Sequence, residues 1–215
     1  MTKAVLWDMD GTLVDSIGHH WTAWRDVAAE VGFNLSYDTF IAMLGKRNDE
    51  IALEWFGPGM PEPERTRVSL DKEARYRSSM RAAGIEPLPG VMDWLSRLRD
   101  AGWKQAIATA APRLNEEAVV DALRLAPWFD ARVTAEDVTR GKPFPDVFLT
   151  AADRLGVPPS RAIVVEDAAA GIAAGRAAGM KTIGVCPHGP LPGADLWVRS
   201  LTELPPDAFD SLLER

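Results

Sequence analysis

Several residue types on which whole classes of protein depend are scarce in this chain. Its 215 residues include a single cysteine, Cys186, which excludes an intrachain disulfide. Lys and Arg number 24 against 31 Asp and Glu, which gives a net charge of −7. This shortage of positive charge argues against a nucleic-acid partner and against an anionic membrane surface. A small anionic substrate stays open, because one metal ion and a few placed cations can reverse the sign of the charge locally.

Long apolar segments are also missing. No run approaches the length of a membrane span, and the N-terminus has no basic stretch followed by an apolar one. We therefore expect a soluble, cytoplasmic protein without a membrane partner and, since no long exposed apolar stripe is evident, a monomer. The length and the 47% share of hydrophobic residues are enough for one large domain or for a core domain with an insertion.

Short apolar runs and amphipathic segments alternate along most of the chain. The runs predicted to form strands are 4–7, 105–109, 131–134, 162–166, 181–185 and 196–198. The segments predicted to form helices between and after them are 91–100, 115–123, 146–155, 171–178 and 208–215. Strands that alternate with helices indicate an α/β fold, in which helices cover both faces of a parallel sheet.

Residues 16–86 interrupt this alternation, because they contain helical patterns only. Helices are predicted at 17–31, 37–44, 49–56 and 62–83. Ser36 is suited to cap the N-terminus of the second of them. We therefore predict a Rossmann-like core made of residues 1–15 and 87–215, with a helical cap domain of residues 16–86 inserted into it.

Residues 8–12, with the sequence Asp-Met-Asp-Gly-Thr, are the most informative stretch and directly follow the apolar run 4–7. Acids at the carboxyl end of a strand lie where open α/β sheets bind their ligands. A carboxylate such as Asp8 can attack phosphorus and form an acyl phosphate, while Asp10 can protonate a leaving oxygen and later activate water. Two acids can also belong to an ordinary turn, but their mutual repulsion favours a site that uses a cation.

Two further residues offer groups that can hold a phosphate. Thr109 ends the run 105–109, where its hydroxyl and nearby backbone N–H groups can bind a phosphate oxygen. Lys142 lies in a loop with the sequence Gly-Lys-Pro-Phe-Pro-Asp, and its ammonium can neutralise charge on a transferring phosphoryl group. Each residue has a simpler interpretation, as a turn threonine and a surface lysine, although the two prolines restrict the lysine loop.

Acids also follow the run 162–166, where Glu166 and Asp167 precede Gly171. Hard cations take oxygen ligands from one or two carboxylates and from a substrate phosphate. These acids can meet those at positions 8–10 only if the two strands are neighbours, which parallel crossovers permit. The alternative is a capping role for the helix that follows. In chain order the four motifs supply a nucleophile, a hydroxyl, a cation and a metal ligand, which are the parts needed for phosphoryl transfer.

In these motifs the chain resembles the haloacid dehalogenase superfamily and, within it, the β-phosphoglucomutase-like phosphatases with a helical cap. The matching segments are residues 8–12, Thr109, Lys142 in its proline loop, and Glu166-Asp167 with Gly171. The resemblance covers nearly the whole chain. It implies a Rossmann-like core, with the helical insertion in the position of the family's mobile cap.

The resemblance also implies a role for each motif. Asp8 is implied to be the nucleophile and Asp10 the general acid and base, while Thr109 and Lys142 hold the phosphate oxygens. The implied cofactor is Mg²⁺, and its implied ligands are the Asp8 carboxylate, the Asp10 carbonyl and Asp167, with Glu166 close by. Asp10 also points away from haloacid dehalogenation and phosphonate cleavage, since family members with those activities lack the second acid.

The sequences of two loops that would face a substrate distinguish a phosphatase from a phosphosugar mutase. Residues 45–48 read Gly-Lys-Arg-Asn, where mutases have Gly-Val-Ser-Arg, and residues 109–115 depart from the mutase pattern Ser-x-Ser-x-x-Asn. Both departures resemble the sugar-phosphate phosphatases. The residues predicted to contact a substrate beyond its phosphate are His20, Lys46, Arg47, Arg113 and Asn115. His20 falls where a mutase cap residue lies, but with Trp21 and Trp24 it can equally form a packed aromatic stripe.

We therefore expect a Mg²⁺-dependent phosphatase, a phosphoric monoester hydrolase that acts on small phosphorylated metabolites through an aspartyl phosphate, with sugar phosphates as the expected class. A β-phosphoglucomutase-type mutase is the alternative. A non-catalytic binding protein on the same fold is a third possibility, since a fold alone does not fix function. The presence of both Asp8 and Asp10 favours catalysis.

Overall fold

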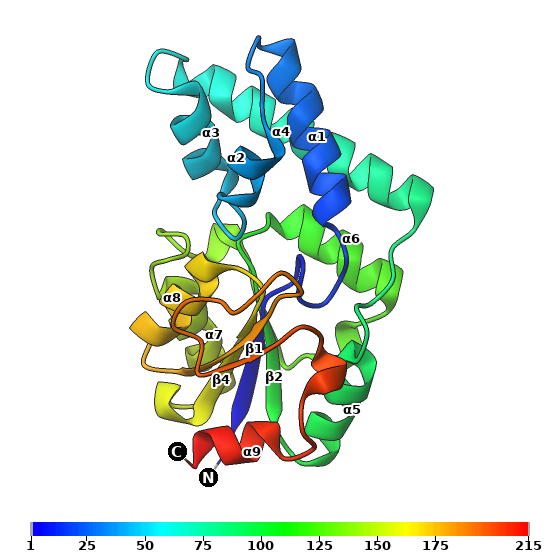
Figure 1. Ribbon diagram of the computed structural model, residues 1–215, viewed down its shortest axis with the longest axis vertical. Helices are drawn as coiled ribbons and strands as arrows, with labels where there is room; N and C mark the ends of the chain where they lie inside the picture. Colours follow the sequence, from blue (N-terminus) through cyan, green and yellow to red (C-terminus); the bar gives the residue numbers. More distant parts are fainter. Residues whose placement is uncertain (1, 215) are drawn as a thin grey trace.

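The computed structural model describes residues 2–214, and its strands form one sheet in which all neighbours are parallel (Figure 1). The strands are β1 (Ala4–Trp7), β2 (Lys104–Ala108), β3 (Ala131–Val133), β4 (Ala162–Glu166), β5 (Lys181–Val185) and β6 (Leu196–Val198). Their order across the sheet is β3-β2-β1-β4-β5-β6. The predicted α/β fold with a parallel sheet is confirmed, and each predicted strand lies within one residue of its expected ends.

The helices fall into two groups. The first group follows β1 directly and consists of α1 (Ile17–Glu30), α2 (Tyr37–Ile41), α3 (Asn48–Phe56) and α4 (Glu62–Ala83). Those packed on the sheet are α5 (Val91–Asp100), α6 (Arg113–Leu123), α7 (Asp146–Leu155), α8 (Ala169–Ala177) and α9 (Ala208–Leu213). Short 3₁₀ helices lie at Ala126–Trp128, Ala135–Asp137, Pro159–Arg161 and Leu201–Glu203. Helix ends differ from the predicted ones by up to three residues, and the last residue of the predicted helix 208–215 lies outside the described residues.

Side chains of β1 alternate between the two faces of the sheet, because successive residues of a strand point to opposite sides. Val5 and Trp7 pack in a cluster with α5, α6 and α9, whereas Ala4 and Leu6 pack with α7 and α8. All four side chains are fully buried, as expected for a strand that is covered on both faces. The Trp7 indole N–H donates to Oε1 of Gln105 at 3.1 Å, so its polar atom also has a partner.

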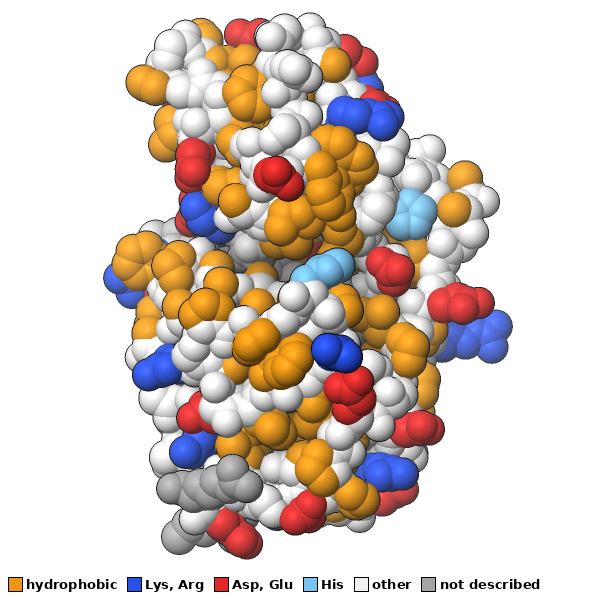
Figure 2. Space-filling view, viewed as in Figure 1, with side chains coloured by type: hydrophobic (Ala, Val, Ile, Leu, Met, Phe, Trp, Pro, Cys, Tyr) orange, Lys and Arg blue, Asp and Glu red, His pale blue; other side chains and the backbone are white. Residues whose placement is uncertain are grey.

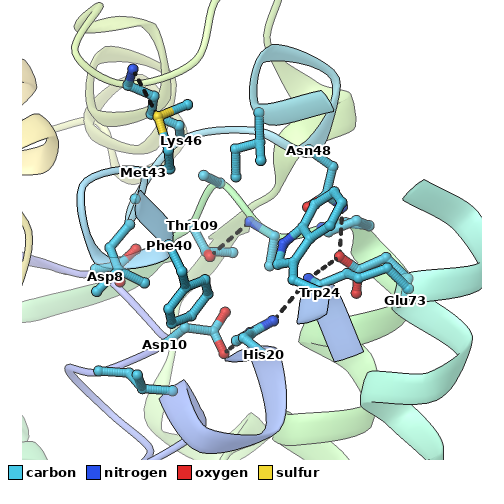
Figure 3. Close-up of a pocket in the computed structure, with 18 residues that line it drawn as sticks. Asp8, Asp10, His20, Trp24, Phe40, Met43, Lys46, Asn48, Glu73 and Thr109 are labelled. Atoms are coloured by element: carbon cyan, nitrogen blue, oxygen red, sulfur yellow. Dashed lines mark hydrogen bonds and ion pairs between the residues drawn. The ribbon is translucent and has the colours of Figure 1, made fainter. Parts of the chain in front are cut away.

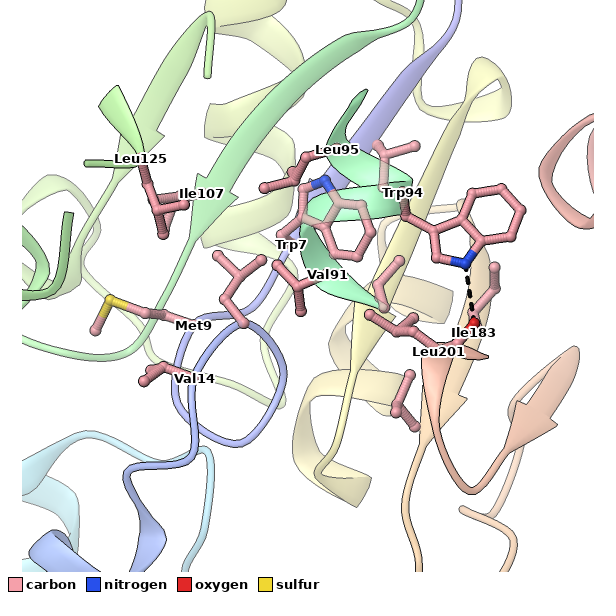
Figure 4. Packing of buried hydrophobic residues seen from close by; sticks show 14 of the residues in the cluster. Trp7, Met9, Val14, Val91, Trp94, Leu95, Ile107, Leu125, Ile183 and Leu201 are labelled. Atoms are coloured by element: carbon pink, nitrogen blue, oxygen red, sulfur yellow. Dashed lines mark hydrogen bonds between the residues drawn. The ribbon is translucent and has the colours of Figure 1, made fainter. Parts of the chain in front are cut away.

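Figure 4 shows the cluster that contains Trp7, in which Trp94 and Leu95 of α5 lie beside the central strands. The Trp94 indole N–H donates to the Leu201 carbonyl at 2.9 Å. The same ring lies 5.0 Å, centroid to centroid, from Phe209 of α9. This packed layer restrains β1, and therefore fixes the position of the residues that directly follow it.

Helices α1–α4, which we call the helical insertion, form a layer beyond the carboxyl ends of the strands (Figure 1). They have an apolar cluster of their own, in which the rings of Trp24 and Trp55 meet edge to face 5.1 Å apart. Helix α2 begins after Ser36, whose hydroxyl accepts a hydrogen bond from the Thr39 N–H at 3.1 Å, as predicted for an N-cap. An insertion of helices after β1 is confirmed, while its limits as a domain, 16–86, stay a prediction.

Charged side chains of both signs are interspersed over the face of the molecule drawn in Figure 2. Large apolar side chains with substantial exposure include Tyr37, Leu53 and Leu70 of the helical insertion. Exposed apolar side chains of this kind are ordinary features of protein surfaces. Within residues 2–214, no helix is both long enough and apolar enough to cross a membrane.

Candidate active site

The segments that carry the predicted motifs meet at the carboxyl end of the sheet. Asp8 directly follows β1, and its N–H donates to the Val165 carbonyl of β4 at 3.0 Å. Because β1 lies between β2 and β4, Thr109 after β2 and Glu166 at the end of β4 flank Asp8. Acids that are far apart in the sequence thus reach one site, as the prediction required.

Lys142 reaches this site from the loop that precedes α7. Its Nζ lies 2.5 Å from Oδ1 of Asp8 and 2.6 Å from Oε1 of Glu166, and the side chain is buried. The Phe148 ring lies close by, with its centroid 5.0 Å from Nζ. Burial alone would lower the pKa of Lys142, but the two carboxylates outweigh burial and raise the pKa above its ordinary value. Lys142 is therefore a fixed, buried positive charge and not a surface lysine.

Asp8, Glu166 and Asp167 form an acidic cluster. One carboxylate oxygen of each residue lies within 4.8 Å of those of the other two. Burial raises the pKa of Asp8 to about 7, because it outweighs the opposing effect of Lys142 and is reinforced by Glu166. Burial, reinforced by Glu166, also raises the pKa of Asp167 well above its ordinary value. Both shifts express the cost of crowding negative charge in a buried place.

The acidic cluster fits Mg²⁺. Three ionised carboxylates beside the ammonium of Lys142 leave two negative charges, which one divalent cation balances. Carboxylate oxygens are also the protein ligands that Mg²⁺ prefers. The adjoining turn makes room for them, since a Cβ on Gly11 would lie 2.1 Å from Oδ2 of Asp167. Gly11 has a φ of 84°, which side-chain-bearing residues rarely adopt, so the turn requires glycine for two reasons.

Gly171 of α8 makes similar room for Glu166. A Cβ on Gly171 would lie 1.8 Å from Oε1 of Glu166, which is bound to Lys142, while the other oxygen accepts the Ala168 N–H at 2.9 Å. We predict that Gly171→Ala lowers the free energy of unfolding by about 2–4 kcal/mol, because it either displaces a buried ion pair or forces α8 away from the sheet. Urea denaturation measures this change.

Gly18→Ala is the matched control. Gly18 lies in α1, and nothing lies within 4 Å of a Cβ built there. Gly18 is the second residue of α1, where alanine has the higher helix propensity and meets nothing, so this variant should be as stable as the wild type or slightly more stable. A Gly171→Ala protein that unfolds at the wild-type urea concentration would show that Glu166 is not held as described.

Asp10 turns its carboxylate toward the helical insertion (Figure 3). Oδ1 of Asp10 accepts hydrogen bonds from the Ser16 hydroxyl at 2.6 Å and the Tyr76 hydroxyl at 3.1 Å, and Nε2 of His20 lies 3.1 Å away. Burial opposes ionisation of Asp10, but His20 and Ser16 outweigh it and lower the pKa to about 2. Asp10 is therefore a carboxylate at neutral pH, and its side chain stays outside the acidic cluster.

His20 has contacts of two kinds, while its contact with a substrate stays a prediction. Its ring stacks on Tyr76 with the ring centroids 3.9 Å apart, which is an aromatic packing role. The same ring contacts Asp10, and its Nδ1 lies 2.8 Å from Nζ of Lys72. His20 thus joins the Asp10 carboxylate to a buried lysine of α4.

Helix α4 contributes three site residues that sequence reasoning missed, namely Lys72, Glu73 and Tyr76. In the sequence this helix is recognisable only as long and charged. Four of its buried residues, Val68, Lys72, Tyr76 and Met80, are spaced four apart and therefore lie along one face. A lysine within an otherwise apolar or aromatic stripe is the signal that points to a buried polar site there.

A cavity of about 70 Å³ lies between the helical insertion and the sheet, with room for a few water molecules. The predicted site residues that line it are Asp8, Asp10, His20, Lys46 and Thr109. The insertion adds the apolar residues Ile17, Trp24, Phe40, Met43, Leu44 and Ile51 and the polar residues Asn48, Lys72 and Glu73 (Figure 3). The cavity therefore has a floor formed by the sheet edge and a wall formed by the insertion.

Two predicted substrate residues precede α3 and differ in position. Lys46 lines the cavity, and its Nζ lies 3.2 Å from Oε2 of Glu54. The neighbouring Arg47 lies outside that cavity, where its guanidinium donates to the Val138 carbonyl at 2.9 Å and pairs with Asp49 at 3.0 Å. Arg47 thus ties the insertion to the loop between β3 and α7, and its contact with a substrate stays a prediction.

The two predicted substrate residues of α6 also lie outside the cavity lining. Arg113 pairs with Asp137 at 3.0 Å at the surface. Asn115 is fully buried, donates its side-chain N–H to Glu73 and accepts a hydrogen bond from Arg77 at 2.8 Å. Neither residue lines the cavity, and the contact of each with a substrate stays a prediction. Asn115 instead supports a carboxylate that does line the cavity.

The chain is similar to both phosphatases and mutases. Residues 2–179 match the family described as haloacid dehalogenase-like hydrolase. The fructose-1-phosphate phosphatase YqaB of Escherichia coli is 35% identical over 184 residues, which cover 84% of this chain and 95% of the relative. The β-phosphoglucomutase of Bacillus subtilis is 32% identical over 209 residues, which cover 94% of this chain and 91% of the relative.

Solved structures extend the similarity to the whole fold. The crystal structure of β-phosphoglucomutase from Clostridium difficile superimposes with a TM-score of 0.90 at 28% identity, over 100% of both chains. A much longer relative, protein SUPPRESSOR OF QUENCHING 1 of Arabidopsis thaliana, is 34% identical over 192 residues, but the chain spans only 18% of its length. The helical insertion over a parallel sheet is therefore shared with proteins of known structure.

Proposed function

The chain belongs to the haloacid dehalogenase-like hydrolases, and we propose that it is a Mg²⁺-dependent phosphatase that hydrolyses phosphate monoesters of sugars. One observation carries the proposal, which is that Asp8 and Asp10 line the same cavity in different surroundings. Asp8 belongs to the acidic cluster with Lys142, whereas Asp10 is held by donors from the insertion. Two carboxylates with different neighbours are suited to two roles, a nucleophile and a general acid and base.

The reaction is proposed to proceed in two steps. First, an Asp8 carboxylate oxygen attacks phosphorus and the bond to the ester oxygen breaks. Asp10, which is a carboxylate in the free protein, has to take up a proton from solvent when the substrate binds, and it gives this proton to the ester oxygen, which leaves as an alcohol. Second, Asp10, now a carboxylate, takes a proton from water, whose oxygen attacks the phosphorus of the aspartyl phosphate and frees Asp8 and inorganic phosphate. Hydrogen bonds from Ser16 and Tyr76 favour the carboxylate form of Asp10 that the second step needs.

The remaining motif residues are proposed to hold the phosphoryl group. Lys142 and Thr109 would bind its oxygens, since a fixed ammonium offsets the charge of the transferring group. The Asp8 and Asp167 carboxylates and the Asp10 carbonyl would hold Mg²⁺, with Glu166 beside them. When bound there, Mg²⁺ supplies the positive charge that keeps the nucleophile ionised and offsets charge on the phosphoryl oxygens.

The helical insertion is proposed to act as a cap that opens for the substrate. A cavity of about 70 Å³ holds a few water molecules and no sugar phosphate, so the insertion must move away for binding and release. We propose that the cap comprises residues 16–86 and the core residues 1–15 and 87–215. Such a movement would break the hydrogen bonds that the Arg47 guanidinium donates to carbonyls of the core.

A phosphosugar mutase is the second candidate. It is supported by the similarity to β-phosphoglucomutases over nearly the whole chain and by the contact of His20 with Asp10. A mutase must also hold the second phosphate of a bisphosphate intermediate. The positions of Arg47 and Arg113, both engaged outside the cavity, favour the phosphatase.

We predict that incubation with β-glucose 1-phosphate, Mg²⁺ and catalytic glucose 1,6-bisphosphate releases inorganic phosphate and little glucose 6-phosphate. EDTA should reduce phosphate release by at least about 10²-fold, because the acidic cluster then lacks its counter-ion. Coupled assays for glucose 6-phosphate and for inorganic phosphate measure both products. Rapid formation of glucose 6-phosphate with little free phosphate would show that the protein is a mutase and not a phosphatase.

A broader screen tests whether the chain is catalytic at all. The screen uses p-nitrophenyl phosphate and a panel of phosphorylated sugars, each with Mg²⁺ and with EDTA. We expect metal-dependent phosphate release from several of them. Absence of such release from every compound would favour a binding protein on the same fold.

A further inference from the structure

Glu73 is a buried carboxylate on the wall of the cavity, and the two-step reaction does not use it. Its side chain is 5% exposed. Oε1 accepts hydrogen bonds from Nζ of Lys72 at 2.7 Å and from the Asn48 amide at 2.5 Å, and Oε2 accepts one from Asn115. Burial opposes ionisation, but Lys72, His20 and the hydrogen bond from Asn115 outweigh it and lower the pKa of Glu73. The cavity wall therefore carries an ionised carboxylate that is paired with the Lys72 ammonium.

Glu73 lies on the side of the cavity toward which the alcohol part of a substrate would extend when the insertion closes over it. Figure 3 places Asp8 and Glu73 on different sides of the cavity, with Asp10 and His20 between them. When the phosphoryl group lies against Asp8 and the leaving oxygen against Asp10, the rest of the molecule points toward α4. The groups that it meets there are Asn48, Lys72 and Glu73, beside the ring of Trp24.

The cations that line the cavity already have carboxylate partners. Nζ of Lys72 lies 2.7 Å from Glu73, and Nζ of Lys46 lies 3.2 Å from Glu54. The donors of Lys72 are further engaged by Nδ1 of His20 at 2.8 Å. A second phosphate or a carboxylate would therefore have to compete with Glu73 for Lys72 and with Glu54 for Lys46. Because the Lys72–Glu73 pair carries no net charge, an anion beside it gains little attraction to offset the hydration that it loses.

Uncharged hydroxyl groups suit the same wall well. The Asn48 amide, the Lys72 ammonium and the Glu73 carboxylate together offer both donors and acceptors, and the Trp24 ring offers an apolar surface for the carbon skeleton. Taking the proposed phosphatase activity as given, we propose that Glu73 restricts the enzyme to phosphate monoesters whose alcohol is uncharged and rich in hydroxyl groups. Esters that carry a second phosphate or a carboxylate at the far end are excluded.

Sorbitol 6-phosphate and 6-phosphogluconate test this, because they share a six-carbon chain and differ in a terminal CH₂OH or carboxylate. We expect kcat/KM of the wild type to favour sorbitol 6-phosphate by at least a hundredfold. Glu73→Gln should reduce that preference at least tenfold, mainly through a lower KM for 6-phosphogluconate. Equal use of the two esters by the wild type would overturn the proposal without any variant, so it stays testable if Glu73→Gln does not fold.

Glu64→Gln is the matched control, since Glu64 lies in the same helix as Glu73 but is exposed and does not line the cavity. It should leave the preference between the two esters unchanged. If Glu64→Gln changed the preference as much as Glu73→Gln does, or if folded Glu73→Gln kept the full preference, Glu73 would not be the determinant.

Binding separates this proposal from the proposed reaction. Calorimetric titration of Asp8→Asn with each ester, in the presence of Mg²⁺, reads selectivity without turnover, and sorbitol 6-phosphate should bind at least a hundredfold more tightly. Failure of the phosphatase proposal shows as absence of metal-dependent hydrolysis of p-nitrophenyl phosphate by the wild type. Failure of the Glu73 proposal shows as equal binding of the two esters, whatever the turnover.

Discussion

Asp8→Asn is expected to lower kcat by more than about 10³-fold for a sugar phosphate and for p-nitrophenyl phosphate alike. An amide cannot attack phosphorus to form the acyl phosphate, and loss of a nucleophile removes the whole covalent route. The fold should persist, because Lys142 keeps Glu166 as a partner at 2.6 Å. The neutral amide also relieves repulsion from Glu166 and Asp167, which lie in the same cluster. Steady-state phosphate release measures the rate, and thermal denaturation measures the fold.

Asp15→Asn is the control for this variant. Asp15 lies a few residues along the same loop, but its side chain is exposed and does not line the cavity. The same chemical change there should leave kcat within about twofold, as is usual for exposed sites away from structural features. Activity of Asp8→Asn above a thousandth of the wild-type value would count against an aspartyl phosphate.

The core of the site is predictable from the sequence, because parallel sheets bring strand ends together. Asp8 and Glu166 each follow a buried apolar run, and their meeting requires only that β1 and β4 be neighbours. Lys142 is recognisable for a local reason, since prolines on both sides of Phe144 restrict its loop. These features depend on short stretches of sequence and on a topology that the fold class already limits.

The far wall of the cavity is not predictable in the same way, because it depends on contacts between separate helices. Glu73 is held by Asn48 of α3 and Asn115 of α6, and no periodicity within one helix reports such a meeting. Long, flexible cations are equally ambiguous. Arg47 follows Lys46 directly, yet Lys46 lines the cavity and Arg47 binds core carbonyls outside it. Which of two adjacent charged side chains faces a ligand is decided by the packing of the insertion on the core.

Asp10→Asn is expected to lower kcat for sugar phosphates by about 10²–10⁴-fold, the usual scale for loss of a general acid and base. Asparagine can still accept hydrogen bonds from Ser16 and Tyr76 through its carbonyl oxygen, so the insertion should keep its position. The side chain can no longer give a proton to the leaving alkoxide or take one from water. Ser36→Ala, which removes an N-cap in the insertion far from the reaction, serves as a control for general loosening of the helices.

The two steps respond differently to Asp10→Asn, and the leaving group separates them. p-Nitrophenolate is weakly basic and leaves without a proton, so formation of the aspartyl phosphate should stay fast in the variant. Hydrolysis of that intermediate still lacks its base, so p-nitrophenolate should appear in a burst of one equivalent per active site and then slowly. A sugar phosphate should give no burst, because its alkoxide needs the missing proton. Rapid-quench kinetics distinguishes these cases, and unchanged rates with both substrates would remove Asp10 from the reaction.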